Sequence, residues 1–303
     1  MSSKRHQVVL IGSLLLIGGA LYSLLNHPAE PRPMPPAFTL PPTQKPVVAR
    51  PVAMTYDFAV PVLMYHRICD LTPREARSPL MRSLTVSPAH FEQQIRYLVE
   101  NGFTFLLARD VEAAVREHRS LPEKAVVLTM DDGYKDNFDH AFPILREYGV
   151  PATMFLVSAT VNTEGHLSWD DVLVMRREQV GYGSHTVHHY DLTLLPAGQV
   201  DYELCASRRT IESHLGERIT DIAYPSGKVN ALVEERTRAD GYLAGWKKGG
   251  GPVQPENDLY LLPRVRVCGG TTMAEFKRIV WSGVYVIRER QRARHNAQQG
   301  TTA

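Results

Sequence analysis

The chain has 303 residues, of which 44% are hydrophobic and 22% are charged, and this length suits one α/β barrel-type domain with an extension. Its formal net charge of +2 is too small to indicate a nucleic acid or an acidic polymer as a partner. Three widely spaced cysteines (Cys69, Cys205 and Cys268) form no CxxC pair, which argues against metal binding through sulfur. One disulfide could form in an exported domain, and the sequence does not choose its pair.

The amino terminus predicts a membrane segment. Basic residues at positions 4–6 precede an apolar run at 8–25, which approaches the minimum length of a membrane-spanning helix. The cationic flank predicts that everything after the run lies outside the cytoplasm. We expect residues 1–27 to anchor the chain in the inner membrane. A cleaved signal peptide is the alternative, because Gly18-Gly19-Ala20 offers small residues, and it would make the protein secreted.

The composition then divides the rest of the chain into three parts. Residues 28–53 are dense in proline and lack apolar periodicity, which predicts a semi-rigid linker. Residues 54–287 are expected to form the folded domain, at the periplasmic side or the cell surface. The composition of residues 288–303 predicts a polar, basic and disordered tail.

Within the folded domain, short apolar runs alternate with amphipathic stretches. We expect strands at 60–65, 103–107, 125–130, 151–157, 180–184, 221–224, 242–246 and 259–267. We expect seven helices between and after these strands. One begins at Ser87-Pro88, one passes through Val111, one contains residues 138–148, one covers 169–177, one covers about 200–215, one passes through Val233 and one covers 273–281. Strands that alternate with helices at this spacing predict a parallel sheet, open or closed into a barrel.

Two adjacent carboxylates follow one of these strands. The strand at 125–130 leads directly into Asp131-Asp132-Gly133, at the carboxyl end where parallel α/β folds build their sites. Adjacent carboxylates repel one another unless a cation or a proton neutralises them. A helix cap followed by a turn at Gly133 would explain the same residues without any chemistry.

Histidines follow a second strand. In Ser184-His185-Thr186-Val187-His188-His189, His185 and His189 are four residues apart and share a face if the segment turns helically. Together with the aspartates they supply two imidazoles and one carboxylate, with a second carboxylate left over. Such a ligand set with open positions is typical of a catalytic metal site, and the spare carboxylate can act as a base.

These motifs resemble the polysaccharide deacetylase family, also called the NodB-homology or carbohydrate esterase family 4 domain. The segment 129–134 resembles the family's T-F-D-D-G motif, with Met130 in place of Phe, and 184–189 resembles its S-H-T-x-x-H motif. The segments 61–66 and 223–227 resemble the branch that contains poly-N-acetylglucosamine deacetylases. The resemblance covers nearly all of residues 60–285 and implies a distorted (β/α) barrel with parallel strands.

The resemblance also implies roles for the four polar residues. Asp131 corresponds to the general base, and Asp132, His185 and His189 correspond to the ligands of a divalent metal. Zinc is the expected metal, with nickel and cobalt as alternatives. The metal would activate a water molecule and polarise the acetyl carbonyl.

Further residues are expected around the substrate. The backbone N–H of Tyr224, in the turn 224–227, is expected to bind the oxyanion of the tetrahedral intermediate. A plain turn is the alternative reading of that segment. Tyr134, Pro225 and Trp169 are expected to contact the polysaccharide.

Two features of the family pattern are missing. Many members have an arginine before the Tyr-Pro turn that steadies the base, whereas this chain has Ile222 and Ala223 there. The family's late Leu-x-His motif, which supplies the general acid, has no counterpart, because Leu262-Pro263-Arg264 ends in an arginine that cannot donate a proton usefully at neutral pH.

The proton source for the leaving amine therefore stays open. His66 at the end of the first strand and His188 are candidates, and Asp131 could return the proton that it took. A packed structural histidine is the competing interpretation of His66.

Together these features predict an enzyme that hydrolyses N-acetyl groups of an extracytoplasmic polysaccharide containing N-acetylglucosamine, such as poly-N-acetylglucosamine or peptidoglycan. An esterase that removes O-acetyl groups from a polysaccharide would use the same metal-bound water. A carbohydrate-binding protein of the same fold with weakened catalysis is the third alternative.

Overall fold

The computed structural model describes residues 54–55 and 57–300, which belong to one compact unit at 49–303. The expected membrane anchor at 1–27 and the proline-rich linker at 28–53 lie outside the described residues. Within the described part, no helix is both long enough and apolar enough to cross a bilayer.

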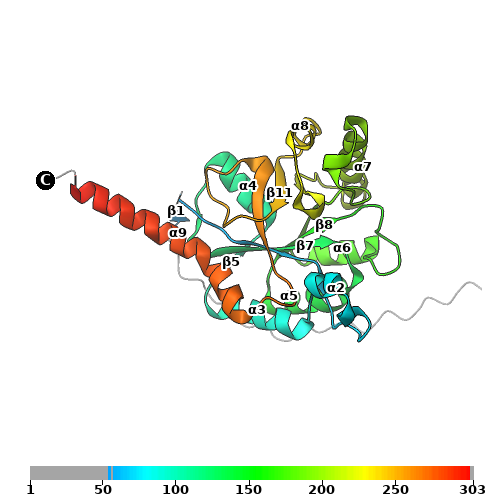
Figure 1. The fold of residues 1–303 in the computed structure, drawn as a ribbon, viewed down its shortest axis with the longest axis horizontal. Coiled ribbons are helices and arrows are strands. Elements are labelled where there is room, and N and C mark those ends of the chain that lie inside the picture. The colour runs from blue at the N-terminus through cyan, green and yellow to red at the C-terminus, as the bar shows by residue number, and fades with distance from the viewer. Residues whose placement is uncertain (1–53, 56, 301–303) are drawn as a thin grey trace, which may run out of the picture. The chain divides into compact units, whose positions relative to one another are not determined.

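Eight parallel strands build the main sheet, in the order β2-β12-β11-β10-β9-β8-β7-β5, and a further pairing of β2 with β7 closes seven of them into a barrel (Figure 1). The strands are β2 (Val62–Tyr65), β5 (Thr104–Leu106), β7 (Ala125–Asp132), β8 (Ala152–Leu156), β9 (Val180–Ser184), β10 (Asp221–Ala223), β11 (Ala244–Lys248) and β12 (Leu262–Arg266). Strand β5 pairs with the first residues of β7. The predicted (β/α) barrel is thereby confirmed.

Helices connect the strands and surround the barrel (Figure 1). They are α2 (Pro79–Leu84), α3 (Pro88–Glu100), α4 (Ala108–Glu117), α5 (Phe142–Tyr148), α6 (Trp169–Arg177), α7 (Ala197–Leu215), α8 (Ala231–Ala239) and α9 (Met273–Gly300), with the single-turn helices η1 (Glu75–Arg77), η3 (Leu192–Leu194), η4 (Pro225–Gly227) and η5 (Leu259–Leu261) and the π-helix η2 (Asn137–Ala141). Four two-residue strands pair at the margins: β1 (Met54–Thr55) with β6 (Leu121–Pro122), and β3 (Arg67–Ile68) with β4 (Thr85–Val86).

Local sequence signals explain where several helices begin. The hydroxyl of Ser87 accepts a hydrogen bond from the N–H of His90 at 3.3 Å, and Pro88 occupies the first turn of α3. Ser168 and Asp171 form a reciprocal capping box at the start of α6. The expected bounds of α6 and β9 agree with the structure because clear caps and turns border both segments.

The carboxyl-terminal helix differs from the expectation. The periodicity predicted a helix at 273–281 and a disordered tail from 288, but α9 continues to Gly300 and its end extends away from the barrel (Figure 1). Arg288 lies 3.6 Å from a carboxylate oxygen of Glu123, and Arg290 lies 2.5 Å from one of Asp57. Basic residues of the expected tail are therefore helical and form ion pairs with the body of the domain.

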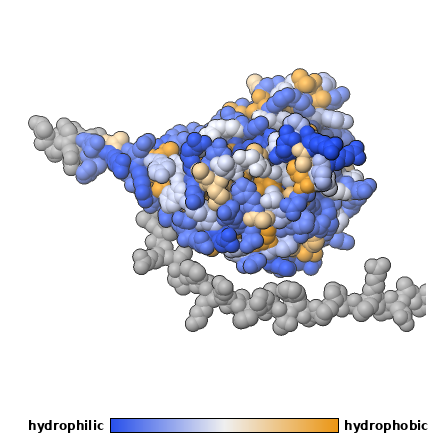
Figure 2. Space-filling view, turned by 60° about the horizontal axis from the view of Figure 1, so that its bottom comes forward, coloured by the Kyte–Doolittle hydropathy of each residue, from blue (hydrophilic) through white to orange (hydrophobic). Residues whose placement is uncertain are grey.

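The core has two parts, because alternate strand residues face opposite sides of the barrel wall. One apolar cluster, which includes Leu63, Leu128 and Met154, packs beneath the surrounding helices. The other includes Val127 and Phe155 and packs on the opposite side of the wall, with α4 against it. On the face of the domain shown in Figure 2, polar residues dominate and apolar residues form small separate patches.

One glycine shows how closely the strands approach one another. A Cβ on Gly183 of β9 would lie 2.4 Å from the ring of Phe155 in the neighbouring strand β8. Only a residue without a side chain fits there, so Gly183 lets the Phe155 ring fill the space beside it.

Candidate active site and metal centre

The two predicted motifs meet at the carboxyl ends of neighbouring strands. In the sheet register, Asp132 of β7 is paired with Leu156 of β8, and Leu156 is paired with Ser184 of β9. The aspartates end β7, and the histidine segment begins immediately after β9. The sheet therefore brings together two motifs that lie about fifty residues apart in the chain.

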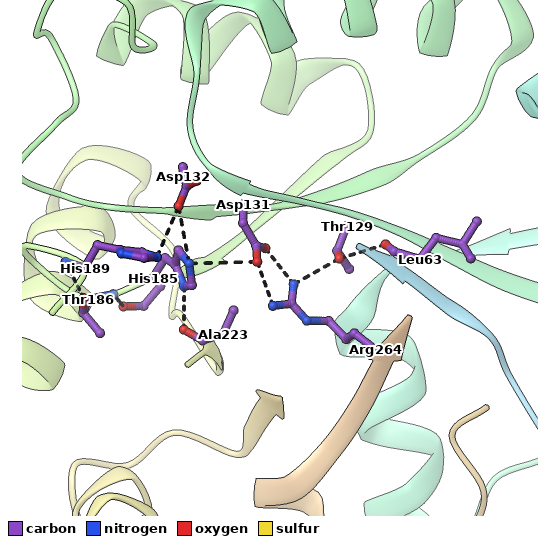
Figure 3. Close-up of polar contacts among 10 residues, drawn as sticks. Leu63, Thr129, Asp131, Asp132, His185, Thr186, His189, Ala223 and Arg264 are labelled. Carbon is purple, nitrogen blue, oxygen red and sulfur yellow. Dashed lines mark hydrogen bonds and ion pairs between the residues drawn. The ribbon is translucent and has the colours of Figure 1, made fainter. Parts of the chain in front are cut away.

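Three residues form a group that can hold a metal ion: Asp132, His185 and His189. The Nε2 atoms of the two histidines lie 3.5 Å and 3.6 Å from Oδ1 of Asp132 (Figure 3). Ligands that are each about 2.1 Å from a tetrahedral metal are about 3.4 Å apart. The observed spacings match this value and are long for hydrogen bonds, so the donor set fits a divalent cation.

His185 is oriented by a backbone contact. Its Nδ1 lies 2.6 Å from the carbonyl oxygen of Ala223, and its ring is almost fully buried. An Nδ1–H donated to that carbonyl leaves the lone pair of Nε2 facing Asp132. A carbonyl that fixes the tautomer in this way is the usual partner of a metal-binding histidine.

The histidine segment does not make the helical turn that would place His185 and His189 on one face. Residues 185–189 form an irregular loop in which Thr186 and His189 have φ values of 69° and 60°. The hydroxyl of Thr186 accepts the N–H of His189 at 3.0 Å and tightens the loop. The loop, rather than a helix face, brings the two imidazoles to 4.7 Å between ring centroids.

Backbone strain is concentrated at this site. Seven non-glycine residues of the described part have left-handed φ values, and four of them are Asp132, Thr186, His189 and Ser226. Such conformations persist only where the surrounding structure enforces them, and they cluster at functional sites. The geometry around the aspartates and histidines is therefore imposed by the fold.

A buried glutamate, which the sequence reasoning missed, holds this loop. Glu203 of α7 accepts the N–H groups of Val187 and His188 at 2.9 Å and 2.8 Å, and its other oxygen lies 2.6 Å from Nδ1 of His188. A signal was available, because Glu203 is a charged residue on the buried face of α7 that contains Val200 and Ser207.

The second aspartate, Asp131, pairs with an arginine from the other side of the barrel. Nη1 and Nη2 of Arg264 donate to Oδ1 and Oδ2 of Asp131 at 2.6 Å and 2.8 Å (Figure 3). Both side chains are buried. Burial opposes ionisation of Asp131, but Arg264 and His185 outweigh it and hold the pKa of that carboxyl well below its usual range.

Arg264 thus supplies a contact that seemed absent from the sequence. The expected position for an arginine that steadies Asp131 was next to the Tyr-Pro turn, where Ile222 and Ala223 stand. Arg264 comes instead from β12, and its Nη1 also donates to Thr129 at 3.1 Å. The available signal was an arginine between the apolar residues Pro263 and Val265 of a strand, since a buried arginine requires a partner.

The site opens into a cavity of about 450 Å³. Its lining includes the candidate metal ligands and Asp131, together with Met64, His66, Leu80, Leu84, Tyr134, Val157, Thr160, His166, His188, Ser226, Gly227, Lys248 and Arg266. His66 is therefore at the site, as expected. Burial and the charges of Arg266 and Arg264 lower its pKa, against the opposing effect of Asp131 and Asp132.

Of the three residues expected to contact the substrate, one lines the cavity. Tyr134 lines the cavity, stacks on His166 at 5.3 Å, and has its pKa raised to about 12 by burial and by Asp132. Trp169 does not line the cavity, because its ring is stacked on His214 at 3.8 Å. Pro225 is buried beside the cavity lining and is not part of it.

The expected oxyanion donor is also corrected by the structure. The backbone N–H of Tyr224 donates to the carbonyl of Trp246 at 3.0 Å, and its side chain is fully buried. Because this N–H is already used in the barrel wall, it is not available to a substrate. The following residues Ser226 and Gly227 are the ones that reach the cavity.

A second hollow, of about 540 Å³, lies away from this chemistry. Its lining includes Pro151 and Val180, at the amino ends of β8 and β9, together with Arg109, Arg176 and Arg177. It contains none of the predicted site residues, although it is the larger of the two. The cavity at the carboxyl ends of the strands is the candidate active site.

Comparisons with known proteins identify the family of this chain. The family model described as polysaccharide deacetylase matches residues 118–245, which include both motifs. The solved structure of a Bacillus anthracis protein assigned to the polysaccharide deacetylases is 30% identical, with a TM-score of 0.66 over 75% of this chain and 70% of that one. The chain belongs to the polysaccharide deacetylase family.

Further relatives define the branch of this deacetylase. The deacetylase PplD of Streptococcus pyogenes, solved in complex with acetate, is 26% identical with a TM-score of 0.70, covering 74% of this chain and 99% of that one. A poly-β-1,6-N-acetyl-D-glucosamine N-deacetylase of Staphylococcus epidermidis is 25% identical, over 68% of this chain and 78% of its own length. The chain is therefore a deacetylase, which is a hydrolase. It resembles the branch of the family that contains poly-β-1,6-N-acetyl-D-glucosamine N-deacetylases.

Proposed function

We propose that this deacetylase hydrolyses N-acetyl groups of a polysaccharide containing N-acetylglucosamine and releases acetate. The observation that carries the proposal is the spacing of Asp132, His185 and His189 at one cavity, with the ionised Asp131 beside them. The name of the Staphylococcus epidermidis relative supports poly-β-1,6-N-acetylglucosamine as the polymer.

The proposed cofactor is zinc, with nickel and cobalt as alternatives, held by Asp132, His185 and His189. A divalent metal in this position supplies an activated water molecule and polarises the acetyl carbonyl. Two imidazoles and one carboxylate leave open positions for water and substrate, as in catalytic zinc sites.

Asp131 is the proposed general base. It is ionised at neutral pH, and its carboxylate Oδ2 lies 3.9 Å from Nε2 of His185, next to the ligand group. It takes a proton from the attacking water as the water oxygen bonds to the carbonyl carbon. Arg264 holds both carboxylate oxygens, which fixes the direction in which the base points.

His66 is the proposed proton donor to the leaving amine. The C–N bond breaks, acetate forms, and the amine nitrogen takes a proton from the imidazolium form of His66. The imidazole is then reprotonated by solvent, to which Asp131 returns the proton that it took from water. His66 lines the cavity, and its Nδ1 is buried without a hydrogen-bond partner among the described residues. His188 is less suited, because Nδ1 of its ring already contacts Glu203. A His66→Gln variant should lose activity on amides more than on aryl acetates, whose leaving group needs no proton, and equal losses would contradict this role.

Two variants of the full chain test the proposed function. Asp131→Asn should lower acetate release from N-acetylglucosamine oligomers at least 100-fold while metal remains bound, because it removes the base and spares the ligands. His189→Ala should lower the metal content measured by elemental analysis. Full activity of Asp131→Asn would exclude the proposed mechanism.

The choice of substrate decides between the remaining alternatives. Acetate release from O-acetylated xylan but from no N-acetylated oligomer would establish an O-acetyl esterase. Binding of oligomers without release of acetate from any substrate would establish a carbohydrate-binding protein.

We also propose that the domain acts outside the cytoplasm, tethered to the inner membrane by residues 1–27. The basic flank and apolar run described above support this orientation. The test is protease treatment of intact spheroplasts, which should digest the domain. Protection of the domain until the membrane is lysed would contradict the proposed location, and recovery in the medium would indicate cleavage.

A further inference from the structure

Three aromatic rings form a stacked row beside the metal-binding loop. The ring of His188 lies 5.2 Å from that of Tyr190 and 6.4 Å from that of Tyr202, with interplanar angles of 22° and 21°. Tyr190 follows the candidate ligand His189 directly, whereas Tyr202 comes from the first turns of α7. The stacking therefore joins two separate elements of the fold, and we call these three residues the aromatic row.

The aromatic row is exposed to an unusual degree. Tyr190 is 53% exposed and Tyr202 is 57% exposed, and they are two of only seven large apolar or aromatic side chains that are strongly exposed in the described part of the chain. Neighbouring exposed aromatic rings leave apolar surface in water, which commonly marks a binding surface.

The row is also held in place before any ligand arrives. The buried carboxylate of Glu203 accepts the backbone N–H of His188 and contacts Nδ1 of its ring, which fixes the central ring. A preformed surface binds a ligand without first losing side-chain freedom. The contacts of Glu203 thus fix the loop with the metal ligands and the row in one arrangement.

The row continues the active-site cavity outward. His188 lines the cavity that contains Asp131 and the three candidate metal ligands, while its ring stacks with the exposed tyrosines. A polymer whose reacting unit lies at the ligand group can therefore place a neighbouring unit on the tyrosines.

We propose that the aromatic row is a binding subsite for a sugar unit adjacent to the one that is deacetylated. This inference rests on the proposed function and specifies how the enzyme binds a polymeric substrate. The C–H face of a pyranose ring packs on the face of a tyrosine, and the tyrosine hydroxyls hydrogen-bond to the sugar hydroxyls. The row therefore favours long chains over short oligomers.

The test compares substrate lengths in the full-length protein. The Tyr190→Ala/Tyr202→Ala variant should raise KM about tenfold for hexamers of β-1,6-linked N-acetylglucosamine, with kcat little changed. Activity on the N-acetylglucosamine monomer, which has no adjacent unit, should be unaffected. Tenfold corresponds to about 1.4 kcal/mol. The Tyr190→Phe/Tyr202→Phe variant keeps the rings and should retain most of the preference for hexamers.

Tyr285→Ala is the matched control, because Tyr285 is 59% exposed on α9 and does not line the cavity. It should behave as the unchanged protein with both substrates. A loss of equal size on the monomer and on hexamers, or no loss on either, would overturn the subsite.

Binding separates this proposal from the proposed function. In the Asp131→Asn background, calorimetric titration with hexamers should show weaker binding when both tyrosines are alanine. Tyrosine-dependent binding in a protein that releases no acetate would retain the subsite and reject the proposed reaction. Hexamer binding that does not depend on the tyrosines would reject the subsite alone.

Discussion

At the scale of single residues, the pair of Asp131 and Arg264 shows what the sequence could and could not reveal. Asp131 was found because adjacent carboxylates after an apolar strand are conspicuous. Its partner lies 133 positions later in the chain and belongs to no local motif. Only the closed barrel, in which β12 joins β2 and β2 joins β7, brings the guanidinium to the carboxylate. Glu203 was missed for the same reason, since its partners lie on another element.

The pair should show strong energetic coupling. Asp131→Asn or Arg264→Gln alone leaves one buried group without its partner and should cost about 3–5 kcal/mol of unfolding free energy. The double variant should cost less than the sum of the two losses, as measured by urea unfolding in a double-mutant cycle.

The exposed pair of Arg238 and Glu234, 2.9 Å apart on α8, is the control. Its coupling should stay below about 1 kcal/mol, because solvent screens a surface pair. A coupling between Asp131 and Arg264 as small as that of the control would show that the buried contact contributes little.

At the scale of secondary-structure elements, adjacent strands hold another buried carboxylate, which lies outside the candidate site. Asp221 of β10 accepts hydrogen bonds from Nε1 of Trp246 in β11 and from the hydroxyl of Thr220, both at 2.7 Å. Burial raises the pKa of Asp221 to about 6, although both hydrogen bonds act in the opposite direction. The sequence predicts only that this residue lies in the strand at 221–224, because nothing local indicates that a strand aspartate will be fully buried.

This carboxylate should make stability depend on pH. Because the folded protein binds the proton more tightly than the unfolded chain, the contribution of Asp221 is complete below about pH 4 and is lost as the pH rises through about 6. Asp221→Asn keeps an acceptor for Trp246 and cannot ionise. Relative to the unchanged protein, it should gain about 3 kcal/mol of unfolding free energy between pH 4 and pH 8.

Urea unfolding at several pH values measures this difference. Comparison of the two proteins cancels the other groups that titrate in the same range. A difference that stays constant from pH 4 to pH 8 would show that Asp221 does not carry the raised pKa.

At the scale of the whole molecule, most of the architecture could be predicted from the sequence. Apolar runs and capping residues gave the strands and helices of the barrel, and strand order brought the two motifs to one edge. The loop at 185–189 could not be predicted, because its left-handed residues depend on Glu203 and on the turn around Thr186. The continuation of α9 could not be predicted either, since it is accompanied by ion pairs to distant residues such as Asp57.

In the proposed mechanism, the group of Asp132, His185 and His189 holds a metal ion that is required for deacetylation. The most direct measurement is acetate release from β-1,6-linked N-acetylglucosamine oligomers by the full-length protein after chelation, and again after addition of one equivalent of zinc. We expect no release above background from the stripped protein. Zinc should restore release in the unchanged chain but not in His189→Ala. Undiminished release by protein that elemental analysis finds free of metal would contradict this mechanism.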